Sequence, residues 1–259
     1  MLTVTESGDG RPLVLLHGWG LHSGVWQSIL PELNKQFHCY AVDMLGHGES
    51  QAGNSKPFDL DNMRDALHVL INNIEADNIV LAGWSLGGLV AMDYSSHFPG
   101  KVKKLILIAA NACFCKQPDW PYGLDATVLD NFSQQLELDY KKTVDKFMAL
   151  QMLGSDDYRR SLKVLKNAIA SRPEPAMQAL RSGLGILKTT DLRKKLSALP
   201  QAILMISGEH DRLIPYQAAE AMQQLFNNAQ STMIKGAGHA PFISHPDEFM
   251  QIMKKFSYG

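Results

Sequence analysis

Residues 79–92 read IVLAGWSLGGLVAM, and this stretch indicates how the chain folds. An apolar run of strand length leads into GWSLG (residues 83–87), and an apolar helical pattern leads out of it. The pentapeptide fits G-x-S-x-G, in which a serine stands on a sharp turn between a strand and a helix. A bare match to this pattern can arise by chance, but the flanking strand and helix favour Ser85 as an activated nucleophile.

The regions before and after this turn alternate between short apolar runs and amphipathic helical patterns. Such alternation predicts right-handed βαβ crossovers and a mostly parallel central sheet with helices on both faces, an α/β fold. The predicted strands are 12–16, 38–43, 78–83, 102–109, 201–207 and 231–234. The predicted helices of this part are 25–37, 60–74, 86–97, 217–226 and 247–256.

The alternation stops between residues 118 and 188, where no strand pattern is present. Four helical patterns occupy this part of the chain, at 128–138, 141–153, 158–171 and 175–187. A helical block inserted between two parts of a parallel sheet is best interpreted as a cap or lid. We therefore predict an α/β core formed by residues 1–117 and 189–259, with residues 118–188 as the inserted helical cap.

A serine hydroxyl needs a histidine to accept its proton, and that histidine needs a carboxylate to fix its tautomer. In this architecture the chain order is serine, acid, histidine. His239 lies in a Gly-rich loop after a predicted strand and is the predicted base. Asp211 follows strand 201–207 at the carboxyl edge of the sheet and is the predicted acid, with Glu209 as the fallback.

Two Gly-rich loops follow the first two predicted strands. The first, LHGWG (residues 16–20), is expected to supply the backbone N–H of Trp19 to an oxyanion hole. The second donor is expected to be the backbone N–H of Leu86. The other loop, DMLGHGES (residues 43–50), lacks the ending of a P-loop and the spacing of a dinucleotide fingerprint, so a structural turn is the better interpretation.

The composition is that of a soluble globular protein, with 259 residues, 45% apolar and 20% charged. A net charge of -1 gives no case for a nucleic-acid or membrane partner. Residues 1–10 lack the pattern of a secretory signal, so a cytoplasmic location is expected. The three cysteines, Cys39, Cys113 and Cys115, suggest reduced thiols rather than disulfides or a zinc site. We expect no metal or cofactor, and a monomer.

Several motifs together resemble the α/β-hydrolase superfamily along nearly the whole chain. They are HGWG, D-x-x-G-H-G-x-S, GWSLGG, GEHD and GHAPFISHP. A closer resemblance is carried by HGWG paired with GWSLGG, NACF (111–114), DWP (119–121), KFMALQMLG (146–154) and HAPFISHP (239–246). By these stretches the chain is similar to the pimeloyl-[acyl-carrier protein] methyl ester esterases of biotin synthesis, in sheet and cap alike.

This resemblance implies hydrolysis of the methyl ester of a pimeloyl chain on acyl-carrier protein, with release of methanol and an end to chain elongation. It also implies that Ser85, Asp211 and His239 form the catalytic triad. The implied substrate-binding residues are Trp19, Ser85, Leu86, Phe147, Met148, Ala149, Leu150, Gln151 and His239.

In that family, arginines of the cap dock the acidic carrier protein. The matching positions here are Lys142, Lys146, Arg159 and Lys163. Three of the four are lysines, which keep the charge but lose the bidentate fork, so the resemblance implies looser and more salt-sensitive docking. Residues 141–166 hold seven Lys/Arg against three Asp/Glu, and each pair is spaced i,i+4 on one helical face. A solvated face of the cap would show the same pattern.

Two other functions fit the sequence. A broad-specificity short-chain carboxylesterase without a carrier partner would use the same triad and differ only in the cap. A non-catalytic binding protein on a hydrolase scaffold is the second alternative, and the intact order of serine, acid and histidine argues against it. A lyase or C–C hydrolase with the same triad also stays open, because fold and triad do not fix the reaction.

Overall fold

The computed structural model describes residues 2–50 and 57–258, which form a seven-stranded sheet in the order β1-β3-β2-β4-β5-β6-β7. All neighbouring strands are parallel except β1, which pairs antiparallel with β3 at the edge. The strands are β1 (Thr3–Ser7), β2 (Arg11–Leu16), β3 (Phe37–Asp43), β4 (Ile79–Trp84), β5 (Val102–Ile108), β6 (Ala202–Gly208) and β7 (Ala229–Ile234). The predicted parallel sheet is confirmed.

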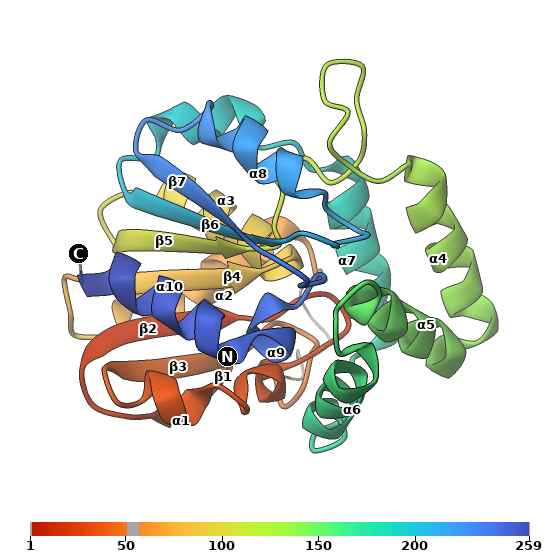
Figure 1. The fold of residues 1–259 in the computed structure, drawn as a ribbon, viewed down its shortest axis with the longest axis horizontal. Helices are drawn as coiled ribbons and strands as arrows, with labels where there is room; N and C mark the ends of the chain where they lie inside the picture. Colours follow the sequence, from red (N-terminus) through yellow and green to blue (C-terminus); the bar gives the residue numbers. More distant parts are fainter. Residues whose placement is uncertain (1, 51–56, 259) are drawn as a thin grey trace.

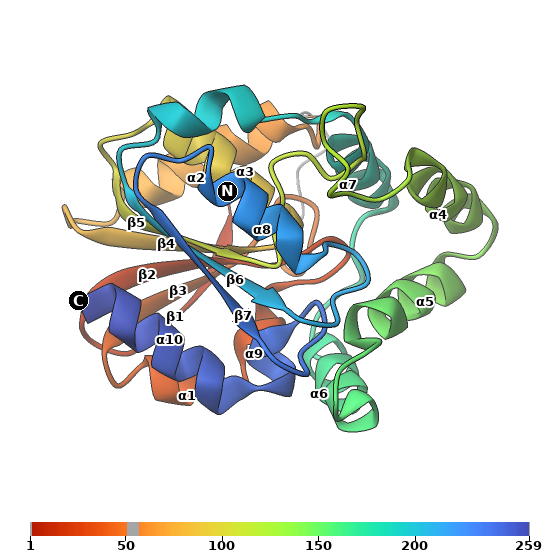
Figure 2. The same cartoon turned by 45° about the horizontal axis from the view of Figure 1, so that its top comes forward.

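Helices cover both faces of the sheet, which gives two apolar layers (Figures 1 and 2). On one face lie α2 (Leu60–Asn72), α3 (Leu86–His97) and α8 (Tyr216–Gln223). On the other face lie α1 (Leu30–Leu33), α9 (Pro241–Ser244) and α10 (Pro246–Tyr258). Within residues 2–50 and 57–258, no helix combines the length and apolar character that crossing a membrane requires.

Two expectations for the N-terminal part were wrong. The predicted helix 25–37 is instead the 3-10 helix η1 (Ser23–Trp26), the short helix α1, and the start of β3 at Phe37. Pro31 lies in the first turn of α1, where its missing N–H is tolerated, and it prevents one continuous helix through this stretch. Strand β1 was not predicted, although its sequence TVTES alternates as an edge strand does.

Four helices lie between β5 and β6 in the chain and gather beyond the carboxyl ends of the parallel strands (Figure 1). They correspond to the four helical patterns of residues 118–188. Their bounds are α4 (Ala126–Leu138), α5 (Tyr140–Met152), α6 (Tyr158–Ile169) and α7 (Met177–Thr189). The chain then returns to the sheet through the 3-10 helix η2 (Arg193–Ala198). We refer to α4–α7 and their connections as the cap.

Candidate active site

Ser85 stands on the turn between β4 and α3 with φ 55°, in the left-handed region that a side chain rarely occupies. The turn is tight because two glycines allow the backbone to approach itself. A Cβ on Gly83 would lie 2.3 Å from the Gly87 carbonyl oxygen. A Cβ on Gly87 would lie 2.5 Å from the His17 carbonyl oxygen. The G-x-S-x-G pattern is therefore required by close packing around this serine.

His239 and Asp211 form a fully buried pair, with 2.7 Å between His239 Nδ1 and Asp211 Oδ2. The second carboxylate oxygen of Asp211 accepts from the amides of Leu213 and Ile214, at 2.8 and 3.0 Å. Because Nδ1 donates to the carboxylate, Nε2 of the neutral ring is left as an acceptor. That Nε2 atom is buried and has no partner among the described residues. The ring is thus held in the tautomer that can accept a proton.

Trp84, the residue before Ser85, brings the histidine loop to the serine turn. Its indole Nε1 donates to the His239 carbonyl oxygen at 2.8 Å. Glu209, the fallback acid, does not face the histidine ring; its Oε2 accepts from the amide of Gly236 at 3.0 Å. The structure therefore pairs His239 with Asp211, while Glu209 supports the loop that leads to His239.

The loop after β2 lies directly beside the serine turn. A Cβ on Gly18 would lie 3.5 Å from Ser85 Cβ, so the neighbouring Trp19 backbone is close to the nucleophile. The Trp19 side chain is fixed by its Nε1, which donates to the Leu180 carbonyl of α7 at 2.8 Å. Leu86 is the first residue of α3, so its amide belongs to the helix N-terminus, where N–H groups have no intrahelical partner.

Two of the predicted cap contacts lie next to these groups. The Phe147 ring packs edge-on against Trp19, with 4.7 Å between ring centroids. One helical turn later, the Gln151 carbonyl oxygen accepts from the amide of His239 at 3.0 Å. Residues at i and i+4 share one face of a helix, so this face of α5 covers Trp19 and His239.

The other predicted contacts of α5 are placed differently. Met148 packs with the residues on the α1–α10 face of the sheet and lines a pocket of about 410 Å³. That pocket lies between α5, the loop at Gly20 and the connection from α6 to α7. Ala149 and Leu150 are half-buried. Five consecutive helical residues point in different directions, which separates Met148 from the face of Phe147 and Gln151.

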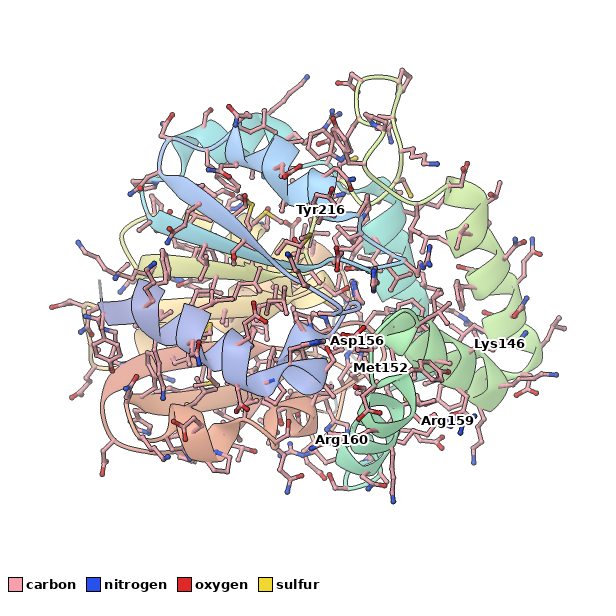
Figure 3. The ribbon with its side chains drawn as sticks, in the orientation of Figure 1. Lys146, Met152, Asp156, Arg159, Arg160 and Tyr216 are labelled. Atoms are coloured by element: carbon pink, nitrogen blue, oxygen red, sulfur yellow. The ribbon has the colours of Figure 1, made fainter. Side chains whose placement is uncertain are left out.

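The four predicted docking residues are exposed on α5 and α6. Lys146 and Arg159 lie on the side of the cap turned away from the sheet, whereas Arg160 lies on the side of α6 that faces α9 and α10 (Figure 3). Among the residues that the structure describes, Lys142, Lys146, Arg159 and Lys163 form no ion pair, although Lys146 Nζ donates to Gln135 Oε1 at 3.1 Å.

The sequence gave no indication of how the cap is fixed to the core, and the structure shows two attachments. The first, the base-side attachment, joins the end of α5 and the α5–α6 connection to the loops that carry His239 and Asp211. Its hydrogen bonds run from His239 N to Gln151 O (3.0 Å), from Asp156 N to Gly236 O (3.0 Å) and from His210 Nδ1 to Gly154 O (2.9 Å).

The second, the oxyanion-side attachment, joins the α6–α7 connection to the loops after β2 and β3. It consists of hydrogen bonds from His22 Nε2 to Ile169 O (3.0 Å) and from Ala176 N to Gly46 O (2.8 Å), with an ion pair between Arg172 and Asp43. The only local signal was Gly46, which has φ 74° and would bring a Cβ within 2.5 Å of Ala179 Cβ.

Two histidines beside the oxyanion loop are buried and neutral. Burial lowers the pKa of His17 to about 3 and that of His47 to about 4. His17 Nδ1 donates to the Gly18 carbonyl at 2.8 Å, and its Nε2 accepts from the amide of Met44 at 3.0 Å. His17 thus connects the loops after β2 and β3, which is a structural role rather than that of a second base.

The described residues contain no group of three His, Cys, Asp or Glu side chains arranged to hold a metal ion. All three cysteines are free and buried. Burial raises the pKa of the Cys39 thiol to about 12 and also raises the pKa of Cys113 and Cys115. The polar groups gathered at the carboxyl edge of the sheet are therefore those of the serine, histidine and aspartate.

Comparison with known proteins places this geometry in a family. Residues 11–246 match the model of the alpha/beta hydrolase fold family. The esterase EaEST from Exiguobacterium antarcticum has the same fold, with a TM-score of 0.91, 22% identity and coverage of 100% of this chain and 96% of the esterase. Bromoperoxidase from Bacillus anthracis superposes with a TM-score of 0.90 at 23% identity, covering 98% of this chain and 94% of that protein.

Curated relatives are more similar in sequence. Pimeloyl-[acyl-carrier protein] methyl ester esterase of Pectobacterium carotovorum subsp. carotovorum (strain PC1) is 39% identical over 98% of this chain and 96% of its own. The protein of the same name from Pseudoalteromonas atlantica is 42% identical over 94% of this chain and 93% of its own. The chain therefore belongs to the α/β-hydrolase fold family and, within it, to the pimeloyl-[acyl-carrier protein] methyl ester esterases.

Proposed function

We propose that this protein hydrolyses the methyl ester of a pimeloyl chain carried on acyl-carrier protein, as a step of biotin synthesis. It is a carboxylic ester hydrolase by family. The observation that carries the chemistry is the buried His239–Asp211 pair, whose ring presents an unpartnered Nε2 beside the turn of Ser85. The substrate follows from the relatives, which carry the name of this activity over nearly the whole chain.

In the proposed mechanism Ser85 Oγ attacks the ester carbonyl while His239 Nε2 takes the hydroxyl proton. The backbone amides of Trp19 and Leu86 stabilise the tetrahedral oxyanion. Collapse breaks the ester bond, and methanol leaves with the proton from His239. Water then attacks the acyl-enzyme, again with His239 as the base, and releases the free carboxylate and Ser85.

The cap supplies the proposed specificity. The acyl chain would contact the segment of residues 147–151, of which Phe147 and Gln151 lie beside Trp19 and His239. Lys142, Lys146, Arg159 and Lys163 would dock the acidic carrier protein. Their support is that they are exposed cations without ion pairs among the described residues, whereas Lys141 and Lys166 nearby pair with Glu174 and Asp145. Residues 118–188 as a separate cap domain, a monomer and a cytoplasmic location stay predictions.

The catalytic assignment is tested with the Ser85→Ala variant. Methanol release from the carrier-bound methyl ester should fall by about 10⁶-fold, because loss of a triad serine removes the covalent path. An active-site phosphonate should label Ser85 in the unmodified protein and leave the variant unlabelled. Absence of label on the unmodified, folded protein would favour the non-catalytic binding protein.

The carrier assignment is tested by reversing Lys142 and Lys146 to Glu. We expect KM for the carrier-bound ester to rise at least about tenfold at low salt, since opposite charge is replaced by like charge. Turnover of a small soluble methyl ester should stay within about twofold. Reversal of the exposed Lys101 and Lys103 before and within β5 is the matched control. Unchanged KM in the cap variant would support the broad-specificity carboxylesterase instead.

A further inference from the structure

Arg172 is the one charged side chain by which the oxyanion-side attachment enters the core. It comes from the α6–α7 connection, and its guanidinium pairs with Asp43 at the end of β3. The Arg172 side chain is 18% exposed and that of Asp43 is 0% exposed. A second guanidinium nitrogen donates to Thr5 Oγ1 of β1 at 2.6 Å. The fork of Arg172 therefore fixes the cap to two core strands at once.

The same Asp43 carboxylate also holds the loops on either side of it. One oxygen accepts from the amide of Ser23 at 2.8 Å, and the other accepts from the amide of Glu49 at 2.9 Å as well as from Arg172. Burial by itself would raise the pKa of Asp43, but the hydrogen bonds from Glu49 and Ser23 outweigh it and lower the pKa. Asp43 is thus a buried carboxylate, ionised at neutral pH, with donors from three segments.

Ser23 belongs to the segment that continues from Trp19, the residue whose amide is the proposed oxyanion donor. That segment is held at its other end by His17, which accepts from the amide of Met44 next to Asp43. Between these two points the loop has no regular secondary structure until η1 begins at Ser23. Its position consequently depends on the carboxylate that Arg172 neutralises.

We infer that Arg172 is a positioning residue for the oxyanion hole. By pairing with Asp43 it fixes the cap and the Trp19 loop relative to each other, and it touches no reacting atom. Removal of the guanidinium leaves a buried carboxylate uncompensated, which favours movement of the surrounding loops toward water. A displacement of about 1 Å of an oxyanion donor is enough to lower a rate by about 100-fold. This role rests on the proposed function, because it acts through the proposed donor.

The experiment compares Arg172→Gln, Arg172→Lys and Arg181→Gln on a small soluble ester, well below each variant's melting temperature. Arg181 is the matched control, since it pairs with Glu137 inside the cap on the exposed surface. We expect kcat of Arg172→Gln to fall about 10- to 100-fold with KM changed less than about threefold. Arg172→Lys keeps the charge and should recover part of kcat, and Arg181→Gln should match the unmodified protein.

A second measurement separates positioning from stability. The rate of phosphonylation of Ser85 uses the same oxyanion donors, so it should fall in Arg172→Gln by a factor similar to that of kcat. A lowered melting temperature with unchanged kcat, KM and labelling rate would overturn the inference. A raised KM with unchanged kcat would overturn it too, because Arg172 would then serve substrate binding alone. Failure of the unmodified protein to label or turn over any ester would instead contradict the proposed function.

Should Arg172→Gln fail to fold, the comparison of Arg172→Lys with the unmodified protein still decides the matter. That variant retains a cation for Asp43 and loses the second contact, to Thr5. We expect a decrease in kcat of about threefold to tenfold without a change in KM. Equal kcat and equal labelling rate in this variant would count against a positioning role.

Discussion

The two attachments of the cap hold different parts of the proposed catalytic machinery by different physical means. The base-side attachment meets the loops of His239 and Asp211, and two of its three hydrogen bonds join backbone groups. The oxyanion-side attachment meets the loops after β2 and β3, and its centre is a buried ion pair. The cap is thus fixed on both sides of Ser85, and it contributes to the site as a support as well as a cover (Figure 1).

The difference in chemistry predicts a difference in sensitivity. Backbone hydrogen bonds survive most side-chain substitutions, so the base side should respond mainly where a glycine allows close approach. A buried ion pair depends on two side chains and on their charges, so the oxyanion side should respond to single substitutions and to acid. The following predictions test this contrast from the largest expected effect to the smallest.

The largest effect is expected at the acid itself. Asp211→Asn should lower kcat by about 10⁴-fold, because the amide cannot hold His239 in the tautomer that leaves Nε2 as the acceptor. Steady-state hydrolysis of a soluble ester measures it. Glu209→Gln is the matched change on the same loop, and we expect a decrease below about tenfold, since Glu209 supports Gly236 rather than the ring. A reversed order of the two effects would make Glu209 the acid.

A smaller effect is expected where the cap touches the base loop. A Cβ on Gly238 would lie 2.8 Å from Ser155 Oγ and 3.1 Å from the Gln151 carbonyl oxygen. Gly238→Ala should therefore displace His239 or the end of α5 and lower kcat about 10- to 100-fold. Gly185→Ala in α7 is the control, because nothing lies within 4 Å of its Cβ position. Equal activity of both variants would show that the base-side attachment is dispensable.

The smallest effect concerns acid stability on the oxyanion side. The pKa of His47 is held by burial at about 4, below its ordinary value of 6.5. Between these values the unfolded chain binds a proton that the folded chain refuses, so stability is complete above pH 6.5 and is lost as pH falls toward 4. Each such histidine contributes a slope of about 1.4 kcal/mol per pH unit in that window.

Urea unfolding at pH 5, 6 and 7 measures this slope. In His47→Gln the dependence should be shallower by about one proton, while His17 still contributes its own part. His38, which is partly exposed near Glu6, offers the control substitution His38→Gln with an unaltered slope. Parallel curves for His47→Gln and the unmodified protein would show that burial of His47 does not oppose its protonation.

Much of the central sheet was predictable because the apolar pattern and the glycine turn constrain each other. β4 and α3 are buried along nearly their whole length, so their apolar runs are unambiguous. The region of 25–37 was not predictable from periodicity, since Pro31 divides it and short helices carry too little pattern. β1 is five residues at an edge, and its assignment depends on pairing with β3.

The sequence by itself determined the order of Ser85, Asp211 and His239 and the glycines around the serine. It could do so because the turn has a steric requirement that only glycine meets. The tertiary structure alone decided that Asp211, and not Glu209, faces the histidine ring. It alone brought Arg172 to Asp43, 129 residues earlier in the chain. Such a pairing depends on where loops of different strands meet, and no local pattern of residues encodes that.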